Sequence, residues 1–364
     1  MTEERDIAGF ALPFAAGALS ASLIPFPSAY CIGAAASMSA VMLTLFMMTW
    51  KFRMTGIPAQ RTIICAAAFL TGASCLSAAT ATSLSSIREL SFISGSATAF
   101  CQRLKDIISE IPFSNHETPA LMTALLTGDR TALPHEVTEA FRASGASHIL
   151  ALSGMHLGII YSLLSSLISK TGNSPRTKTL RSSAIILCCW FYTIGTGAGE
   201  SITRAFLFIL LNEIGTLTHR KASLKELIMA ALIIQLAVDP LSVRSVSFQL
   251  SYAAMAGIAF IHPHLKGLWP DDGKGPMRKI WESASISISC QMTTGPLAWL
   301  YFRTFPQYFL LTNLIAVPLA GLIIPISLLT IASSAAGICP DCLISMTERL
   351  MSLLTGALRG IAQM

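Results

Sequence analysis

Residues 125–158 read LLTGDRTALPHEVTEAFRASGASHILALSGMHLG and combine a polar beginning with an apolar end. The stretch begins with a polar turn, Gly128-Asp129-Arg130, and continues through a short polar helix that ends near Arg142. It then enters an apolar segment that carries five residues of special chemistry, His148, Ser153, Gly154, His156 and Gly158. Polar groups at membrane depth cost free energy unless they face a cavity or a partner. These residues are therefore predicted to be functional.

The whole chain has the composition of a membrane protein. Of its 364 residues, 53% are hydrophobic and only 12% are charged, whereas soluble domains contain about 25% charged residues. A transmembrane helix needs about 17 to 25 predominantly apolar residues. Segments of this length predict an all-α, polytopic transmembrane bundle of about ten to eleven spans. They lie near residues 7–24, 29–50, 61–83, 148–169, 180–199, 201–218, 224–239, 246–262, 281–302, 307–336 and 343–361.

Basic residues in the short loops predict the orientation of these spans. The loops at 51–61, 170–181, 219–225 and 264–279 hold fourteen Lys and Arg residues, whereas the alternate short loops hold only Arg244 and Arg303. Cytoplasmic loops carry an excess of Lys and Arg, so the four rich loops and the N-terminus are predicted to lie in the cytoplasm. The formal net charge of +6 then mainly reflects topology and is weak evidence for a nucleic-acid ligand.

Residues 84–147 are then predicted to lie on the outer side of the membrane. Apolar residues between Ile87 and Ile111 recur at helical spacing against charged ones, which predicts an amphipathic helix interrupted near Ser94-Gly95-Ser96. Such a helix either rests on the membrane surface or packs on the bundle. The chain is thus divided into a three-span region, an outer amphipathic segment and a second transmembrane domain, at residues 1–83, 84–118 and 119–364.

The apolar region 307–336 contains two prolines, Pro318 and Pro325. Proline in a membrane helix releases backbone carbonyls that must find water or neighbouring groups, so we expect a broken helix that lines a cavity. The sequence leaves open whether this region crosses the membrane once or twice. The side of the membrane on which the C-terminus lies is therefore open as well.

Three interpretations of His148, Ser153 and His156 are open at this point. On one helix the two histidines would lie on similar faces about 12 Å apart, and Ser153 would share the face of His156. The residues either line a pore or gate, form a serine–histidine dyad of an intramembrane protease, or belong to a packing surface with Gly154 and Gly158. The protease is disfavoured, because a serine three residues before a histidine on one helix does not readily present its hydroxyl to that imidazole.

Further polar residues lie within other apolar segments. Arg204 either meets a passing phosphate backbone or pairs with Glu200, four residues earlier, and reaches outward to water. Asn212 and Glu213 extend the polar face of the same segment. Single amides and hydroxyls that join helices or line a hydrated interior are predicted at Gln249, Ser251, Gln291 and Asn313.

The same residues resemble the signature of the ComEC competence family. The resemblance covers roughly residues 119–336, and its most specific part is the run Ser153-Gly154-Met155-His156-Leu157-Gly158. Other matching residues are Gly128-Asp129-Arg130, Phe141-Arg142, Ser144-Gly145-Ala146-Ser147-His148, Arg204-Ala205, Asp239-Pro240, Phe248-Gln249-Leu250-Ser251, Asn313, Ala316 and Pro318. The resemblance implies a channel in the bacterial inner membrane for the uptake of single-stranded DNA in natural transformation.

The resemblance also implies what such a channel would need from other proteins. Members of the family commonly carry a nucleic-acid-binding barrel and a metal-binding nuclease domain, and this sequence contains the pattern of neither. We therefore expect no enzymatic activity, no metal and no cofactor, with a separate nuclease and DNA-receptor protein as partners; a homo-oligomer is compatible with these expectations. The alternative function is a carrier for a small polar or anionic solute, with broken helices at its binding site.

Overall fold

The computed structural model describes residues 2–23, 65–73, 91–169, 174–219, 222–269, 275–303 and 306–364. Every regular element in these ranges is a helix, so the prediction of an all-α protein is confirmed. The helices form two compact units, which we describe separately. Unit 1 takes its residues from 1–90 and 218–252, and unit 2 from 91–217 and 253–364. The functional division at residues 83 and 118 stays a prediction.

Unit 1 has a small core of its own. It contains α1 (Thr2–Leu23), a helical segment at 65–73, α11 (Leu224–Val238), the 3-10 helix η3 (Pro240–Arg244) and most of α12 (Val246–Ala256). The backbone of α1 touches the 65–73 segment so closely that a Cβ at Gly17 would lie 1.9 Å from the carbonyl oxygen of Phe69. Glycine is therefore required at this crossing. The core is formed by Phe14, Ala68, Leu232, Leu236, Val243 and Phe248.

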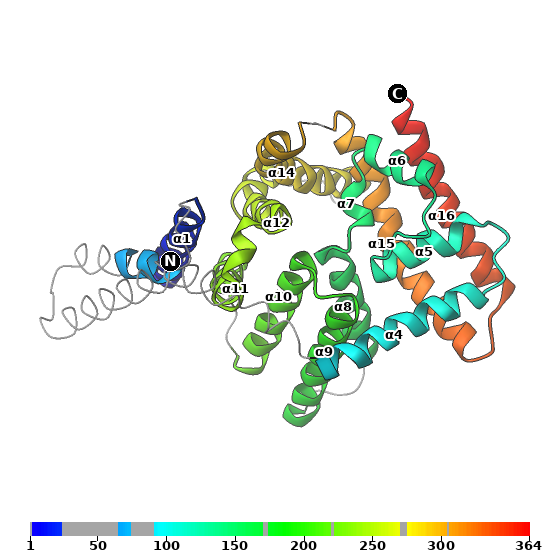
Figure 1. The fold of residues 1–364 in the computed structure, drawn as a ribbon, viewed down its shortest axis with the longest axis horizontal. Coiled ribbons are helices and arrows are strands. Elements are labelled where there is room, and N and C mark those ends of the chain that lie inside the picture. Colours follow the sequence, from blue (N-terminus) through cyan, green and yellow to red (C-terminus); the bar gives the residue numbers. More distant parts are fainter. Residues whose placement is uncertain are drawn as a thin grey trace, which may run out of the picture. The chain divides into compact units, whose positions relative to one another are not determined.

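Unit 2 contains the helices that carry the 125–158 segment. In chain order they are α4 (Ser91–Glu110), α5 (Glu117–Thr127), α6 (His135–Ala143), α7 (Ser147–Leu150), α8 (Gly154–Ile168), α9 (Pro175–Gly195), α10 (Glu200–Leu217), the π-helix η4 (Gly257–Ile261), α13 (His262–Lys266), α14 (Pro276–Phe302), α15 (Phe309–Ala335) and α16 (Asp341–Ala362). One core lies among α4 to α7, α15 and α16, and a second lies among α8, α9 and α10 (Figure 1). The Tyr192 hydroxyl of α9 joins the two cores by donating to the carbonyl of Leu126 at 2.6 Å.

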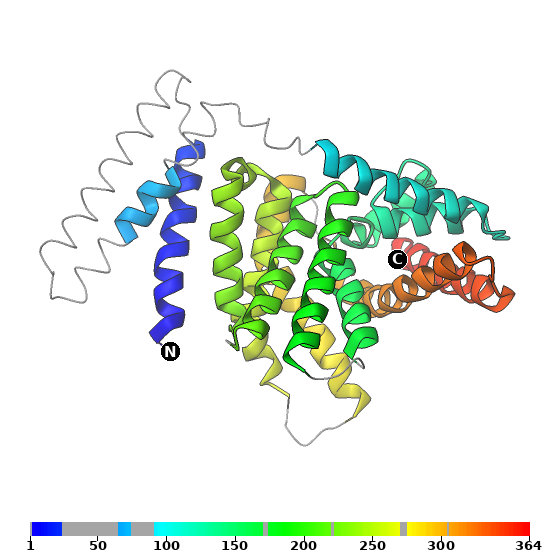
Figure 2. The same cartoon turned by 90° about the horizontal axis from the view of Figure 1, so that it is seen from below.

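The predicted amphipathic segment is α4, which packs on α5, α9 and α15; it begins beside α9 and runs away from the α8–α10 group (Figure 2). Its Phe100 ring contacts Phe191 of α9 edge to face at 5.3 Å. Packing on the bundle is thus confirmed, but the predicted interruption is wrong, because α4 is continuous through Gly95. One glycine costs only about 1 kcal/mol relative to alanine in a helix, which the burial of Cys101 and Ile108 further along α4 offsets.

The expected broken helix in 307–336 is also wrong. α15 passes through Pro318 and Pro325 as one continuous helix. Each proline removes one backbone hydrogen bond of the helix. Around them, small and branched side chains are fully buried in the core that α15 shares with α16, namely Ala316, Ala320, Ile323 and Ile324. A break would take these side chains out of the core, so the packing of α15 outweighs the lost hydrogen bonds.

Among the described residues, a single helix, α15, is both long and apolar enough to cross a membrane by length and composition. Shorter apolar helices occur at Ala11–Ala21 and Gly154–Ile168. Figure 2 shows α8, α9 and α10 side by side, with α15 running across their direction. The predicted span at 29–50 and most of the one at 61–83 lie outside the described residues. The count of ten to eleven spans therefore stays a prediction.

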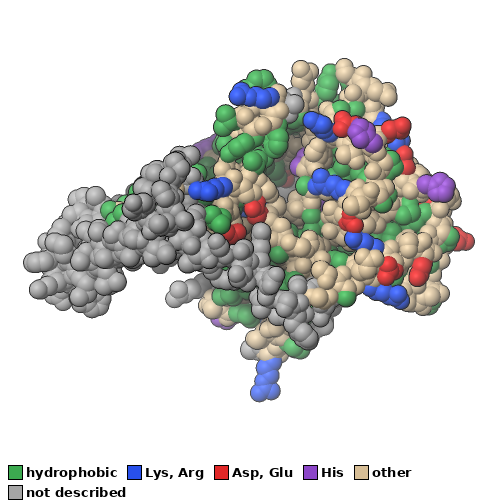
Figure 3. Space-filling model, in the orientation of Figure 1, with side chains coloured by type: hydrophobic (Ala, Val, Ile, Leu, Met, Phe, Trp, Pro, Cys, Tyr) green, Lys and Arg blue, Asp and Glu red, His purple; other side chains and the backbone are tan. Residues whose placement is uncertain are grey.

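Charged side chains on one face of unit 2 gather over α4 to α6 and α16 (Figure 3). Two ion pairs connect these helices: Lys105 with Asp129 at 2.5 Å, and Arg359 with Glu117 at 2.6 Å. Both pairs are partly exposed, so each contributes at most about 1 kcal/mol. This part of unit 2 has the polar surface expected of a water-facing region.

Candidate functional site in the 125–158 segment

The polar turn after α5 is fixed to α4 by a charge pair. α5 ends where Gly128 adopts a left-handed φ of 77°, a conformation that glycine enters without steric cost. The carboxylate of the next residue, Asp129, accepts a hydrogen bond from Lys105 Nζ at 2.5 Å and another from the backbone N–H of Thr131 at 3.0 Å. These bonds, that of Lys105 first, hold the pKa of the Asp129 carboxyl well below its usual value. Asp129 is thus an ionised structural residue at neutral pH.

The two predicted arginines of this segment lie on the protein surface. Arg130 is exposed, and its Nε donates to the carbonyl of Leu150 at 3.2 Å, which ties the turn to the end of α7. Arg142 is exposed on α6, with its Nη1 3.6 Å from Glu139. Both guanidinium groups remain accessible to an anion, but a position in a channel stays a prediction.

The turn between α6 and α7 is locked against α15. Gly145 adopts a left-handed φ of 82°, and a Cβ there would lie 2.6 Å from Cβ of Pro306. The preceding carbonyl, that of Ser144, accepts a hydrogen bond from the Thr312 hydroxyl of α15 at 2.7 Å. The turn therefore has room for glycine alone, and it fixes the position at which α7 begins.

His148 and His156 do not share one helix. α7 ends at Leu150, residues 151–153 are not helical, and α8 begins at Gly154. The predicted arrangement of both histidines on one helical face, 12 Å apart, is therefore wrong. The His148 side chain is exposed, and its Nδ1 lies 3.2 Å from the carbonyl oxygen of Gly145.

Ser153 and His156 form a cap at the start of α8. The backbone N–H of Ser153 donates to His156 Nδ1 at 3.2 Å, and the Ser153 hydroxyl oxygen lies 3.0 Å from the same nitrogen. Because a backbone N–H can only donate, Nδ1 is the acceptor and the ring hydrogen sits on Nε2. The His156 side chain is 1% exposed, and its buried Nε2 has no hydrogen-bond partner among the described residues. His156 thus directs an unsatisfied donor into the protein interior.

This geometry corrects one argument against a serine–histidine dyad. The Ser153 hydroxyl does reach the imidazole, because Ser153 precedes α8 in an extended conformation instead of lying on the helix. A catalytic dyad would also need a third group that orients the histidine through its other nitrogen. Within the part of the chain that the structure describes, His156 Nε2 has no such partner, so the pair is interpreted as a helix cap.

The two glycines of the signature differ in their surroundings. A Cβ at Gly154 would lie 3.1 Å from Cβ of Ala205 on α10, whereas a Cβ at Gly158 would meet nothing within 4 Å. Close helix packing through small residues is therefore confirmed at Gly154. At Gly158 no atom of the described residues comes within 4 Å, so close packing at this position stays a prediction.

Arg204 lies inside unit 2. Its side chain is 3% exposed, and its Nη2 donates to the Ser201 hydroxyl at 3.2 Å. The prediction that the guanidinium reaches outward to water is therefore wrong, whereas its pairing with Glu200 stays a prediction. Contact of Arg204 with a passing phosphate stays a prediction.

The four polar residues predicted on other helices divide between the units. Gln249 and Ser251 lie on α12 in unit 1, where Gln249 Nε2 donates to the carbonyl of Val243 at 2.9 Å. Gln291 on α14 is half-buried in unit 2. Asn313 on α15, also in unit 2, has a buried Oδ1 to which no described residue donates a hydrogen bond. That all four residues line one channel stays a prediction.

A buried carboxylate joins α8, α9 and α10, an arrangement that the sequence analysis missed. Glu213 of α10 is 5% exposed. It accepts hydrogen bonds from Tyr161 of α8, at 2.8 Å, and from Ser182 of α9, at 2.6 Å. An acidic residue in an apolar segment signals function by itself, but no sequence spacing relates it to the two hydroxyl residues.

Replacing Tyr161 by Phe is expected to lower the free energy of unfolding by about 1–3 kcal/mol, because a buried acceptor of Glu213 loses its donor. The measurement is unfolding of the detergent-solubilised chain by sodium dodecyl sulfate. Ser162→Ala is the matched control on the same helix, since the Ser162 hydroxyl is exposed and bonds only the carbonyl of Gly158; its effect should stay within about 0.5 kcal/mol. Equal effects of the two substitutions would show that Glu213 does not need the tyrosine.

Comparison with known proteins decides the family. A family model described as Competence protein matches residues 125–364, which is more than half of the chain. The chain belongs to the competence protein family. The matched region begins at the first residue of the 125–158 segment, and the ComEC resemblance of this segment is thereby confirmed.

Two relatives of this competence protein are curated. ComE operon protein 3 of Bacillus subtilis (strain 168) is 26% identical over 234 residues, which are 62% of this chain and 29% of the relative. Uncharacterized protein YcaI of Escherichia coli (strain K12) is 23% identical over 252 residues, which are 67% of this chain and 33% of the relative. The chain therefore spans about a third of the length of these curated relatives. No solved structure matches it.

Proposed function

We propose that the chain forms the membrane channel through which single-stranded DNA enters the cytoplasm in natural transformation. The observation that carries the proposal is that two buried polar atoms of the region that defines the family, His156 Nε2 and Asn313 Oδ1, have no hydrogen-bond partner in the described part of the chain. A buried polar atom without a partner costs about 1–3 kcal/mol. Water or a polar solute that meets these atoms removes this cost, so the atoms suit a hydrated route.

Cationic groups support a polyanion as the solute. Arg130 and Arg142 are exposed near the beginning and the middle of the 125–158 segment, and Arg204 is buried. A backbone of phosphates moves along positive potential without covalent chemistry. These three residues are proposed to attract and guide the strand.

Large apolar side chains on α8 and α9 support a location in the bacterial inner membrane. Leu167, Leu180 and Leu187 are 65%, 72% and 61% exposed. Apolar side chains exposed in this number mark contact with lipid or with another protein. We propose that lipid covers this face, within a polytopic bundle whose N-terminus is cytoplasmic.

The proposed orientation is testable with reporter fusions. Fusions after Arg61 and after Lys178 are expected to be active on the cytoplasmic side, because loops rich in Lys and Arg remain there. A fusion near Asn115 should report the outer side. The measurement is paired alkaline phosphatase and green fluorescent protein activity at each site. Fluorescence at Asn115 would reverse the whole orientation.

The chain itself is proposed not to be an enzyme. His116, Asp129 and His135 are too few and too scattered to hold two catalytic metals, and in the described parts of the chain no three His, Cys, Asp or Glu side chains are grouped for metal binding. Removal of one DNA strand would then require a separate nuclease and a DNA-receptor protein. Purified protein is expected to leave DNA intact with added manganese, magnesium or zinc. Cleavage that is lost on mutation of the histidines would contradict this.

A carrier for a small polar or anionic solute is the second candidate. One observation favours it: the helix break at residues 151–153, since carriers place their binding sites at broken helices. Deletion of the gene separates the two candidates. For a DNA channel, transformants should disappear and return when the gene is supplied again. A normal transformation frequency after deletion would favour the carrier.

A further inference from the structure

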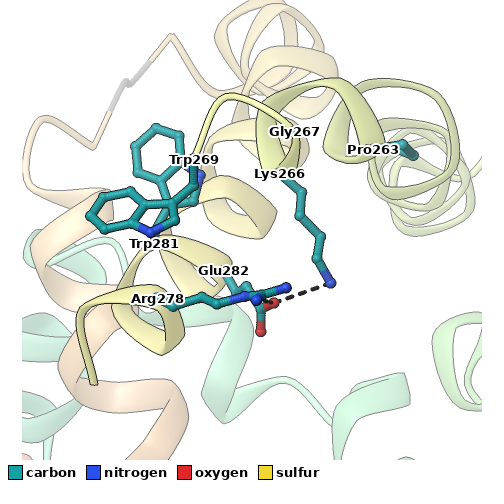
Figure 4. Close-up of a pocket in the computed structure, with 7 residues that line it drawn as sticks. All are labelled: Pro263, Lys266, Gly267, Trp269, Arg278, Trp281 and Glu282. Atoms are coloured by element: carbon teal, nitrogen blue, oxygen red, sulfur yellow. Dashed lines mark ion pairs between the residues drawn. The ribbon is translucent and has the colours of Figure 1, made fainter. Parts of the chain in front are cut away.

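A cavity of about 250 Å³ in unit 2 lies where α13 approaches the beginning of α14 (Figure 4). Two cationic side chains line it and share one carboxylate. Lys266 Nζ lies 3.1 Å and Arg278 Nε 3.5 Å from the same oxygen of Glu282. One carboxylate balances only one of the two positive charges, so the described side chains that line the cavity carry a net positive charge. None of these three side chains belongs to the 125–158 segment.

Two tryptophans form the other side of the cavity. The rings of Trp269 and Trp281 have centroids 5.9 Å apart and planes inclined by 31°. The Trp281 indole donates to the carbonyl of Leu265 at 3.2 Å, which fixes the orientation of its ring. Both side chains are half-buried, so each ring is held by the protein and still offers part of its surface to the cavity (Figure 4).

We propose that this cavity binds one phosphate and the adjoining base of single-stranded DNA as the strand reaches the cytoplasmic side. The inference rests on the proposed function and on the predicted cytoplasmic location of the loop 264–279. Lys266 and Arg278 meet the phosphate, and a tryptophan ring stacks on the base. Proteins that bind single strands without sequence preference combine these two elements. The cavity is slightly smaller than the roughly 300–1,000 Å³ typical of pockets for drug-sized ligands, in keeping with one nucleotide unit.

Glu282 is the residue that makes the inference most testable. Its carboxylate forms ion pairs with Lys266 and Arg278, the two side chains that would bind the phosphate, so it competes with the phosphate for them. Glu282→Gln should therefore tighten binding, by about threefold or more. Arg278→Ala should weaken binding about three- to tenfold, from the loss of one ionic contact. A gain of affinity cannot result from misfolding, which keeps the test valid even if a variant is less stable.

The experiment uses the full chain in nanodiscs of phosphatidylcholine and a fluorescent oligothymidylate of about ten nucleotides, within the usual footprint of such sites. Fluorescence anisotropy gives the dissociation constant at several salt concentrations. Lys279→Ala is the matched control, since Lys279 is exposed and adjacent to Arg278 but does not line the cavity. Its affinity should match that of the unchanged protein. Arg278→Ala should also reduce the salt slope by roughly 0.7.

The stacking contact has a separate test. Trp269→Leu should weaken binding of the oligothymidylate about fivefold or more, but should leave binding of an abasic strand of the same length unchanged. Equal losses for both strands would overturn the stacking role.

A phosphate-bearing lipid headgroup is the competing occupant. Vesicles that contain phosphatidylglycerol, added as competitor, should leave oligothymidylate binding unchanged. Their displacement of the strand together with unchanged affinity of Glu282→Gln would overturn the proposal. If gene deletion abolishes uptake but the cavity variants bind the strand normally, the cavity proposal alone fails. If the variants change binding but deletion leaves transformation normal, the proposed function alone fails.

Discussion

His156→Leu is expected to lower DNA uptake by roughly 10- to 100-fold while the protein remains inserted in the membrane. A hydrogen bond to a group in the protein interior contributes about 1–3 kcal/mol, and each 1.36 kcal/mol in a barrier changes a rate about tenfold. Leucine fills a similar volume but removes the buried Nε2 donor. Transformation frequency and the amount of protein in the membrane are the two measurements.

His156→Leu also removes the helix cap, which by itself can lower uptake. A second substitution separates this cause from the loss of the Nε2 donor. At the third position of a helix, glutamine reaches back to the capping N–H, and its amide still offers donors. His156→Gln should therefore retain more uptake than His156→Leu. His135→Leu, which removes an exposed histidine on α6, should change nothing. Normal uptake by His156→Leu would leave only a packing role for this residue.

Gly145→Ala is expected to destabilise the chain by about 2–4 kcal/mol, the second large effect. A left-handed conformation costs a residue with a Cβ about 1–2 kcal/mol, and forcing an extra methyl group into a packed core costs about 1–3 kcal/mol. Both costs apply, because Gly145 has a φ of 82° and its new Cβ would lie 2.6 Å from Pro306. Unfolding by sodium dodecyl sulfate measures the change.

Gly158→Ala is the matched control for this prediction. A Cβ at Gly158 would meet nothing within 4 Å, and the residue lies inside α8. Alanine is favoured over glycine in a helix by about 1 kcal/mol, so this variant should be as stable as the unchanged protein or more stable. A large destabilisation by Gly158→Ala would mean that the glycine packs against a partner, such as a second copy of the chain.

The sequence by itself determined the helical class and the approximate position of most helices. Apolar residues in long uninterrupted runs favour helices wherever backbone groups must be satisfied within the segment. For this reason the predicted segment 343–361 corresponds closely to α16 (Asp341–Ala362), and 201–218 to α10 (Glu200–Leu217). The family was also readable, because its signature is a local run of residues around His156.

The start of α8 is also determined by local sequence, namely by its capping residues, but it was not predicted. Ser153 is a favoured residue before a helix, and His156 stands at the position where glutamate or glutamine usually completes the cap. Histidine serves in the same way here through Nδ1. Because histidine is not the usual residue, the sequence analysis placed both histidines on one helix.

Only the tertiary structure decided the remaining features, because they depend on contacts between residues far apart in the chain. The continuity of α15 through its prolines follows from packing against α16, and the two donors to the Glu213 carboxylate, Tyr161 and Ser182, come from two other helices. The cavity beside Trp269 and Trp281 exists because α13 folds back onto α14. Local propensity and periodicity describe one segment at a time, so they carry no information about which side chains meet.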